Sequence, residues 1–248
     1  MPARMPLAGL RGPRPTPNGS AAHLTPRHMR PQRCPTALCT ATIIPDAGAG
    51  AARDCHPARM PKLMIVIAST RPGRVGLPVA QWFTGRANAH GHFDVVVEDL
   101  LERDLPFLDE PNHPRLRRYT HQHTIDWSER VDAADAFVFV TPEYNNGICA
   151  PLKNAIDFLH VEWMQKPVAF VSYGGVSAGT RGVQMTKQVV TTLSMWPITE
   201  AVNIPFVAQF LDDDGEIQAN EVMENAATAM LDALGRVEAA VRVLRAES

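Results

Sequence analysis

Five short apolar runs, separated by segments of helical periodicity, constrain the fold of this chain more than any other feature. Two of them, LMIVIAS (63–69) and DAFVFVT (135–141), are almost wholly apolar and rich in β-branched or aromatic residues. An uninterrupted run of this kind is typical of a strand that is buried on both faces of a sheet. We therefore expect strands at residues 63–69, 93–100, 135–141, 166–175 and 198–204.

The segments between the runs are predicted to be helices. In VGLPVAQWFTGRANA (75–89), Val75, Val79 and Phe83 fall on one helical face. Proline is favoured in the first turn of a helix, so Pro151 marks the start of another. The predicted helices occupy 75–89, 115–133, a segment beginning near Pro151, 180–195 and 219–246. Repeated strand–helix alternation predicts one doubly wound α/β domain, in which a five-stranded parallel sheet carries helices on both faces.

The first 60 residues differ chemically from the rest of the chain. They contain eight arginines, no lysine and ten of the 21 prolines, but only two acidic residues, Asp46 and Asp54. Prolines at this density interrupt helices and strands, and the segment has too little apolar surface to offset the entropy of ordering. We predict that residues 1–60 form a disordered Pro/Arg-rich extension and that residues 61–248 form the folded domain. The sequence leaves three origins for the extension: a flexible tail, a targeting segment, or a start set ahead of the natural one at Met60.

The charge of the folded domain restricts its partners. The extension carries a net charge of +6 and the whole chain −2, so residues 61–248 carry −8. Such an acidic body argues against nucleic acid as a partner. No apolar run approaches the length that crosses a bilayer, so no membrane partner is expected. Cys149 is the only cysteine in residues 61–248, which fits a reducing cytoplasm.

A histidine pair, His121 and His123, lies within the predicted helix 115–133. Residues two apart on a helix face different directions. We therefore expect a solvated helix face there rather than a metal site, and no metal ligand is predicted.

The loop after the first strand is predicted to bind a phosphate group. Residues Ser69 to Gly76 bring two hydroxyls, two arginines and two glycines to the N-terminus of a helix. Helix N-termini attract anions, and arginine adds charge-assisted bonds to phosphate. The pattern matches neither the P-loop nor the G-x-G-x-x-G motif, which disfavours nucleotide hydrolysis and dinucleotide binding. A solvated loop that is merely basic is the alternative.

The loops after the third and fourth strands are polar and contain aromatic residues and glycines. They read TPEYNNG (141–147) and SYGG (172–175). In open α/β sheets, ligands bind beyond the carboxyl ends of the strands, where the strand order reverses. Together with a phosphate loop, these residues suit a flat heteroaromatic ring joined to one phosphate. A tight turn, in which Asn146 and Gly147 supply positive φ angles, explains only part of the first loop.

The segments TPEYNNGICAPLKNAIDFL (141–159) and IASTRPGRVG (67–76) resemble the NADPH-dependent FMN reductase family, which has the flavodoxin-like fold. The resemblance covers residues 62 to about 205. It implies bound FMN, with NADPH or NADH as the electron donor, in an enzyme that passes two electrons to flavin, quinone, azo or similar acceptors. Because the cofactor performs the chemistry, no catalytic side chain is expected.

The resemblance also implies which residues bind FMN. The loop after the first strand holds the phosphate, the P-E-Y-N loop lies along the isoalloxazine, and the loop after the fourth strand completes the pocket. The implied residues are Ser69, Arg71, Arg74, Val75, Gly76, Pro142, Glu143, Tyr144, Asn145, Ser172, Gly174 and Gly175. Family members often carry Ser and Asn where Arg74 and Gly76 stand, so backbone contacts are expected to replace side-chain contacts there.

Two other functions are weighed against a reductase. One is an FMN-binding electron carrier, and the other is a flavin-dependent regulatory domain without NAD(P)H oxidation of its own. The arginines of the first loop differ from the Thr/Ser-rich phosphate loop of flavodoxins, which disfavours the carrier. The resemblance further implies a homodimer or homotetramer. Its candidate contact residues are Phe158, Leu159, Val161, Trp163 and Met164, unless they cap the core of the monomer.

Overall fold

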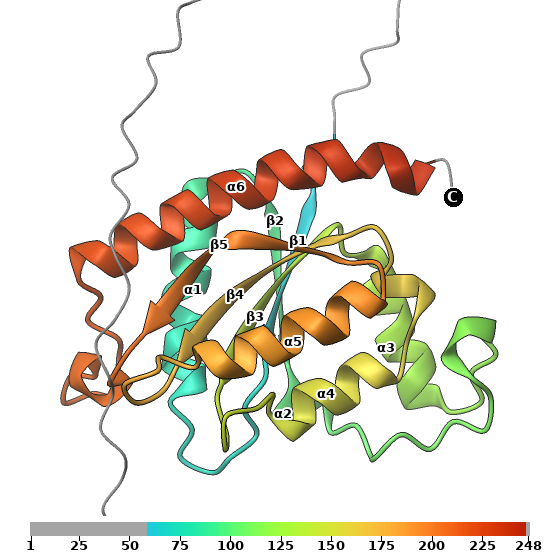
Figure 1. The fold of residues 1–248 in the computed structure, drawn as a ribbon, viewed down its shortest axis with the longest axis horizontal. Helices are drawn as coiled ribbons and strands as arrows, with labels where there is room; N and C mark the ends of the chain where they lie inside the picture. Colours follow the sequence, from blue (N-terminus) through green and yellow to red (C-terminus); the bar gives the residue numbers. More distant parts are fainter. Residues whose placement is uncertain (1–58, 247–248) are drawn as a thin grey trace, which may run out of the picture. The chain divides into compact units, whose positions relative to one another are not determined.

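The computed structural model describes residues 59–246, so all but the last two residues of the predicted extension (1–60) lie outside it. A five-stranded parallel sheet of order β2-β1-β3-β4-β5 forms the centre (Figure 1). The strands are β1 (Lys62–Ile67), β2 (Asp94–Asp99), β3 (Ala136–Pro142), β4 (Pro167–Tyr173) and β5 (Trp196–Ile204). All five predicted strands are therefore confirmed. This strand order is flavodoxin-like, and it reverses between β1 and β3.

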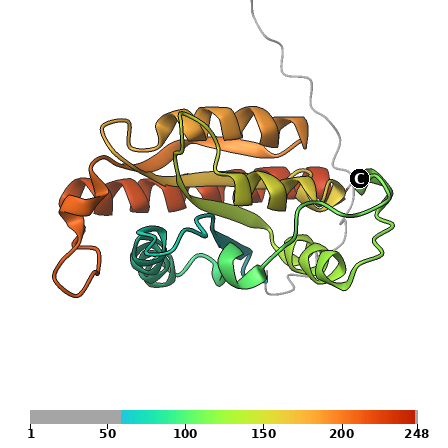
Figure 2. The same cartoon turned by 90° about the horizontal axis from the view of Figure 1, so that it is seen from below.

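Helices cover both faces of the sheet, as Figures 1 and 2 show. One face packs against α1 (Gly76–His90) and α6 (Glu221–Ala246), and the other against α3 (Gln122–Ala133), α4 (Ala150–Asp157) and α5 (Thr180–Thr192). Neighbouring residues of β1 divide between the two cores, with Ile65 on the α1 side and Met64 on the α3 side. A short helix, α2 (Leu100–Arg103), follows β2 directly and was not predicted.

The predicted helix 115–133 is wrong in its first part. Residues Pro114–Leu116 form a 3₁₀ turn, and α3 begins only at Gln122. The carboxylate of Glu110 accepts hydrogen bonds from the backbone N–H groups of Thr120, at 2.9 Å, and His121, at 3.0 Å. These bonds fix the chain in an extended form just before α3, so the helix cannot start earlier.

The expectation that His121 and His123 face different directions is also wrong. His121 is the N-cap of α3 and has extended backbone angles, so helical geometry does not separate the two rings. The rings stack with centroids 5.3 Å apart and an interplanar angle of 7°, and His123 Nε2 lies 3.0 Å from an Asp109 carboxylate oxygen. Within residues 59–246, no group of three or more His, Cys, Asp or Glu side chains is arranged to hold a metal ion.

The residues proposed as a dimer surface belong mostly to the core of the monomer. Phe158, Leu159 and Trp163 are buried, and Trp163 packs edge-on against Trp127 of α3 with ring centroids 6.0 Å apart. The segment after α4 is apolar because it caps the core, so the expected contact surface is wrong for these three residues.

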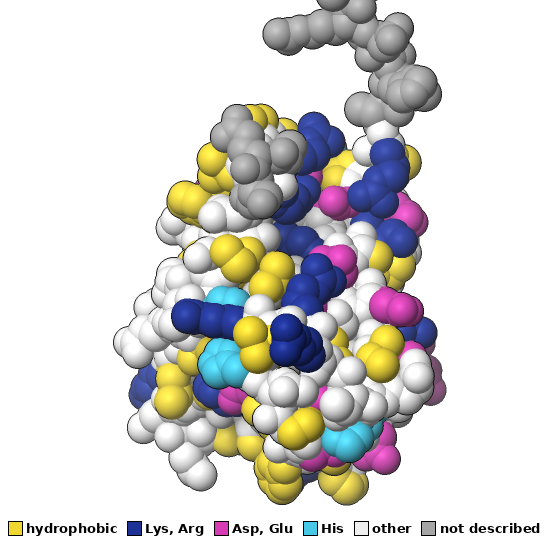
Figure 3. All heavy atoms as spheres, turned by 90° about the vertical axis from the view of Figure 1, so that its right-hand side faces the viewer, with side chains coloured by type: hydrophobic (Ala, Val, Ile, Leu, Met, Phe, Trp, Pro, Cys, Tyr) yellow, Lys and Arg dark blue, Asp and Glu magenta, His cyan; other side chains and the backbone are white. Residues whose placement is uncertain are grey.

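Charged side chains of both signs occur on the surface of the domain. On the face in Figure 3, basic side chains lie among acidic, histidine and apolar ones. Of the helices described here, none has an apolar stretch long enough to cross a membrane.

Candidate functional site

Three loops meet beyond the carboxyl ends of the neighbouring strands β1, β3 and β4. The hydroxyl of Ser69, after β1, lies 3.2 Å from the hydroxyl of Tyr144, after β3. The carboxylate of Glu143, in the same β3 loop, accepts a hydrogen bond of 3.1 Å from the hydroxyl of Ser177, after β4. Two side-chain contacts thus join the three segments that the sequence singled out.

The partial positive charge at the N-terminus of α1 is not neutralised by the loop between β1 and α1. Its N-cap residue, Val75, has no side chain that accepts a hydrogen bond, and the first turn contains no acidic residue. The guanidinium-bearing Arg71 is exposed on the same loop. The free N–H groups at a helix start carry partial positive charge. This loop could therefore hold an anion.

Arg74, by contrast, already has an acidic partner. Its guanidinium forms a two-pronged ion pair with Asp99 at the end of β2 and donates a 2.7 Å hydrogen bond to the carbonyl of Ser69. Both charged side chains are about nine-tenths buried, with exposed fractions of 9% and 8%. The hydrogen bond with Asp99 raises the pKa of Arg74. The side chain of Arg74 thus ties the loop to β2 instead of pointing freely toward a ligand.

Asp99 belongs to the candidate site through Arg74, although it was not predicted from the sequence. It pairs with Ile67 in the parallel register of β1 and β2, which places it beside the start of the β1 loop. An acidic residue at the carboxyl end of a strand next to an arginine-rich loop was the available signal.

The P-E-Y-N segment forms a tight turn. Tyr144 and Gly147 exchange backbone hydrogen bonds, and Asn145 and Asn146 between them have φ angles of 51° and 65°. Two successive positive φ angles are typical of a two-residue hairpin turn, and asparagine tolerates them. The turn expected at Asn146-Gly147 therefore lies one residue earlier. This turn leaves Tyr144 partly exposed beyond the carboxyl end of β3, beside Ser69.

Glu143 fastens this turn to α5. Besides Ser177, its carboxylate accepts the backbone N–H of Arg181 at 2.9 Å and the Arg181 side chain at 3.3 Å. Gly182 of α5 also packs closely against the turn, because a Cβ at this position would lie 2.9 Å from the carbonyl oxygen of Gly147. The carboxylate of Glu143 therefore acts as a cap for α5, whereas Tyr144, Asn145 and Asn146 are exposed on the turn.

The residues at the end of β4 and in the loop before α5 differ in what they can offer a ligand. The side chain of Ser172 is buried and donates a 2.9 Å hydrogen bond to Asn203 on β5, so it is not brought together with Tyr144. Gly174 and Gly175 follow and offer backbone groups only. Tyr173, which was not among the predicted site residues, is buried with its hydroxyl beside Gly76 of the first loop.

Cys149, although close to the site, has the properties of a structural residue. Its thiol is buried near Thr141 and the carbonyl of Ala68, and burial raises the pKa of the thiol. A protonated, buried thiol is a poor nucleophile.

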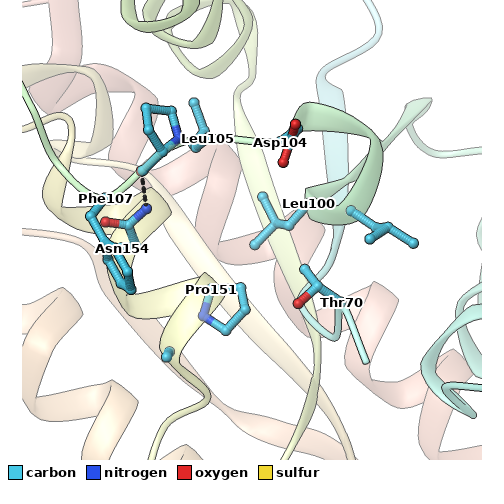
Figure 4. A pocket seen from close by; sticks show the side chains of 10 residues that line it. Thr70, Leu100, Asp104, Leu105, Phe107, Pro151 and Asn154 are labelled. Atoms are coloured by element: carbon cyan, nitrogen blue, oxygen red, sulfur yellow. Dashed lines mark hydrogen bonds between the residues drawn. The ribbon is translucent and has the colours of Figure 1, made fainter. Parts of the chain in front are cut away.

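A hollow of about 410 Å³ opens beside the first loop, between α2 and α4 (Figure 4). Asn154 of α4 pins the loop that borders it, by donating to the carbonyl of Pro106 at 2.7 Å and accepting from the N–H of Leu108 at 3.1 Å. Phe107, between these two anchors, has an exposed fraction of 87%. The lining residues are Thr70, Leu100, Leu101, Asp104, Leu105, Pro106, Phe107, Ala150, Pro151 and Asn154.

Comparison with known proteins shows which family the sequence matches. Residues 61–209 match the family described as NADPH-dependent FMN reductase. An NAD(P)H-dependent FMN reductase of Schizosaccharomyces pombe is 38% identical over 149 residues, covering 58% of this chain and 74% of the relative. One from Saccharomyces cerevisiae is 35% identical over 156 residues, covering 58% and 81%. A probable NADPH:quinone oxidoreductase of Oryza sativa is 31% identical over 146 residues, covering 56% and 70%.

Solved structures show the same fold at low sequence identity. The flavoenzyme NAD(P)H:acceptor oxidoreductase FerB from Paracoccus denitrificans aligns with a TM-score of 0.59 at 19% identity, covering 72% of this chain and 97% of that one. An oxidoreductase from Corynebacterium diphtheriae aligns with a TM-score of 0.53 at 14% identity, covering 73% and 97%. Family match, close relatives and fold agree: the chain belongs to the NADPH-dependent FMN reductase family.

Proposed function

We propose that this protein is an NAD(P)H-dependent, FMN-containing oxidoreductase whose cofactor lies across the loops after β1, β3 and β4. The observation that carries the proposal is the junction of these loops, in which Ser69 of the phosphate loop contacts Tyr144 of the P-E-Y-N turn at 3.2 Å. Bound FMN supplies the redox chemistry, which is two-electron exchange with a nicotinamide and with an acceptor.

The residues present fit a flavin phosphate at the β1 loop. The N-terminus of α1 has no side-chain cap, Arg71 is exposed beside it, and the buried hydroxyl of Tyr173 has no hydrogen-bond partner among the described residues. An unneutralised helix end with a nearby arginine binds a phosphate by charge and by hydrogen bonds. Among residues 59–246, no comparable set of ligands exists for a metal ion.

The predicted site residues take different roles in this proposal. Ser69, Arg71, Val75 and Gly76 bind the phosphate with their side chains or backbone N–H groups, and Arg74 positions that loop through Asp99. Tyr144 and the backbone of Pro142 and Asn145 orient the ring, and Glu143 positions the turn through α5. Ser172, whose side chain is engaged by Asn203, contributes backbone groups together with Gly174 and Gly175.

The experiment is anaerobic reduction of the purified full-length protein. We expect flavin absorbance in the purified protein and rapid bleaching when NADPH or NADH is added, followed by recovery on addition of a quinone, an azo dye or free flavin. Flavin that bleaches only with a chemical reductant would indicate an electron carrier. Protein that neither contains nor binds flavin would contradict the proposal.

For the assembly, we propose a homodimer formed by the surface around Phe107. Phe107 is highly exposed, is held by hydrogen bonds at both neighbouring residues, and lines the edge of a mostly apolar hollow. A two-fold interface uses the same surface of both subunits, so that surface must fit itself. A projecting side chain beside a hollow meets this requirement, because the side chain of each copy can enter the hollow of the other. The exposed Leu101 and Leu108 extend the apolar area of this surface.

We further propose that residues 61–248 form the reductase domain, that residues 1–60 are an extension to it, and that the protein is cytoplasmic. The single free cysteine of the described residues, Cys149, is compatible with a reducing compartment.

A further inference from the structure

Tyr173 is a buried tyrosine whose hydroxyl is left unpaired. It is the last residue of β4, its exposed fraction is 5%, and its hydroxyl has no hydrogen-bond partner in the described part of the chain. Buried polar groups in folded proteins are nearly always paired, so an orphan needs an explanation. Phenylalanine would fill the same apolar space without leaving a polar atom unsatisfied.

The hydroxyl reaches the first residue of α1. A Cβ built on Gly76 would lie 2.4 Å from Tyr173 Oη and 3.3 Å from Cζ. The phenol therefore extends from the end of β4 to the helix start where the proposed phosphate binds. Only glycine fits at position 76 while the hydroxyl is there.

The neighbours of this hydroxyl are residues of the loop itself. Ser69 is close enough to offset part of the rise that burial causes in the pKa of Tyr173, yet no hydrogen bond of acceptable geometry joins them. The hydroxyl of Ser69 lies instead within 3.2 Å of Tyr144. Because burial keeps the phenol protonated at neutral pH, the group is available as a donor.

We infer that the hydroxyl of Tyr173 donates a hydrogen bond to the phosphate monoester bound at the N-terminus of α1, and that Gly76 is needed to leave this contact open. The uncapped helix end and the unpaired buried hydroxyl are two independent features that point to the same anion. This inference rests on the proposed function and assigns a further residue to its phosphate subsite.

The first test is Tyr173→Phe in the full-length protein, stripped of flavin and titrated with FMN and with riboflavin by flavin fluorescence. The FMN affinity should fall about tenfold or more, because a hydrogen bond to a charged group is lost. The riboflavin affinity should stay within about twofold, because riboflavin has no phosphate. Equal affinities for FMN before and after the substitution, or equal losses for both ligands, would overturn the inference. If the unsubstituted protein binds riboflavin as tightly as FMN, the proposed phosphate loop itself fails.

Thermal unfolding of the flavin-free protein separates this role from a structural one. Tyr173→Phe removes an unsatisfied polar atom, so the flavin-free variant should unfold at the same temperature or higher, while the stabilisation by saturating FMN becomes smaller. A lower unfolding temperature without flavin would show that the hydroxyl is paired within the protein, which contradicts the inference.

A second pair of variants tests the contact between Gly76 and Tyr173. Gly76→Ala places a methyl group against the hydroxyl and should weaken FMN binding, and adding Tyr173→Phe should recover part of the affinity, because the nearest ring atom is then 3.3 Å away. Gly85→Ala is the matched control, since a Cβ at this exposed position of α1 meets nothing within 4 Å. A double variant that binds no better than Gly76→Ala would contradict the contact.

Discussion

The hydroxyl groups of Ser69 and Tyr144 lie 3.2 Å apart, although 75 residues separate them in the chain. Ser69 lies just after β1, at the start of the proposed phosphate loop, and Tyr144 lies in the turn after β3. The contact therefore joins the proposed phosphate end of the site to the proposed ring end. It also fixes the tyrosine ring, which is otherwise partly exposed.

Substitution of Tyr144 should weaken FMN and riboflavin alike. Tyr144→Ala removes a ring contact worth roughly 0.5–1.5 kcal/mol beyond buried area, and the two ligands share the ring that it contacts. Tyr144→Phe removes only the hydrogen bond to Ser69 and should have a smaller effect, about 1 kcal/mol or less. Fluorescence titrations of both variants with both flavins measure this. A loss restricted to FMN would place Tyr144 at the phosphate instead.

Arg71→Ala should weaken FMN binding selectively. Among residues 59–246, no acidic side chain pairs with the exposed guanidinium of Arg71, whereas Asp99 pairs with Arg74. Removal of Arg71 therefore deletes a charge-assisted contact to the phosphate worth roughly 1.5–3 kcal/mol. This corresponds to an affinity about 10- to 150-fold lower for FMN, with a much smaller change for riboflavin. Arg242→Ala, the same charge change at an exposed position of α6, is the control and should leave both affinities unaltered. Equal losses for FMN and riboflavin would remove Arg71 from the phosphate site.

The sequence predicted the elements of the site better than the contacts within it. The five strands and the three polar loops follow from continuous apolar runs and from the rule that ligands bind at the carboxyl ends of parallel strands. Which arginine remains free does not follow from either. Arg71 and Arg74 look equivalent in the sequence, and only the register of β1 with β2 brings Asp99 to Arg74.

Local backbone geometry was the other feature that could not be predicted from the sequence. The start of α3 depends on Glu110, a residue in a proline-rich loop ten or more positions earlier, whose carboxylate takes up the N–H groups before the helix. A helical period read from residues 115–133 contains no sign of that contact. The stacked pair of His121 and His123 followed from the same shift, because it leaves His121 outside the helix.

The cap that Glu110 provides should make stability depend on pH. Burial acts to raise the pKa of this carboxyl, but the N–H groups of His121 and Thr120 hold it at about 2, below its ordinary 4.5. A depressed pKa in the folded state stabilises the protein above the unfolded value. The contribution is therefore full above pH 4.5 and is lost as the pH falls toward 2.

Glu110→Gln tests this dependence by urea unfolding from neutral pH downward. The variant should be less stable at neutral pH by roughly 1 kcal/mol, and the difference should vanish as the pH approaches the folded-state value. Glu129→Gln, which changes an exposed carboxylate on α3, is the control. A difference that stays constant over the whole range would show that Glu110 acts by shape rather than charge.

A chain that begins at Met60 should fold and keep its flavin. The first strand starts at Lys62, and within the described residues the cut removes the ion pair of exposed Arg59 with Asp135. Asp135 retains Arg245 and the N–H of Lys62 as partners. Flavin content and the unfolding temperature of the shortened protein should match those of the full chain. A matched cut that begins at Ile65, inside β1, should give insoluble protein, and the same outcome for the Met60 start would contradict the proposed domain boundary.

Phe107→Asp should dissociate the proposed dimer without unfolding the subunit. Phe107 contributes almost nothing to the core, since its exposed fraction is 87%, whereas a charge on this face opposes burial against a second copy. Light scattering at micromolar concentration should give a dimer for the unsubstituted protein and a monomer for the variant, with unchanged circular dichroism. Val222→Asp places the same charge at an exposed apolar residue of α6 and should leave the dimer intact. If Val222→Asp dissociates the protein and Phe107→Asp does not, the interface lies on the α6 face; an unsubstituted protein that is already monomeric removes the dimer altogether.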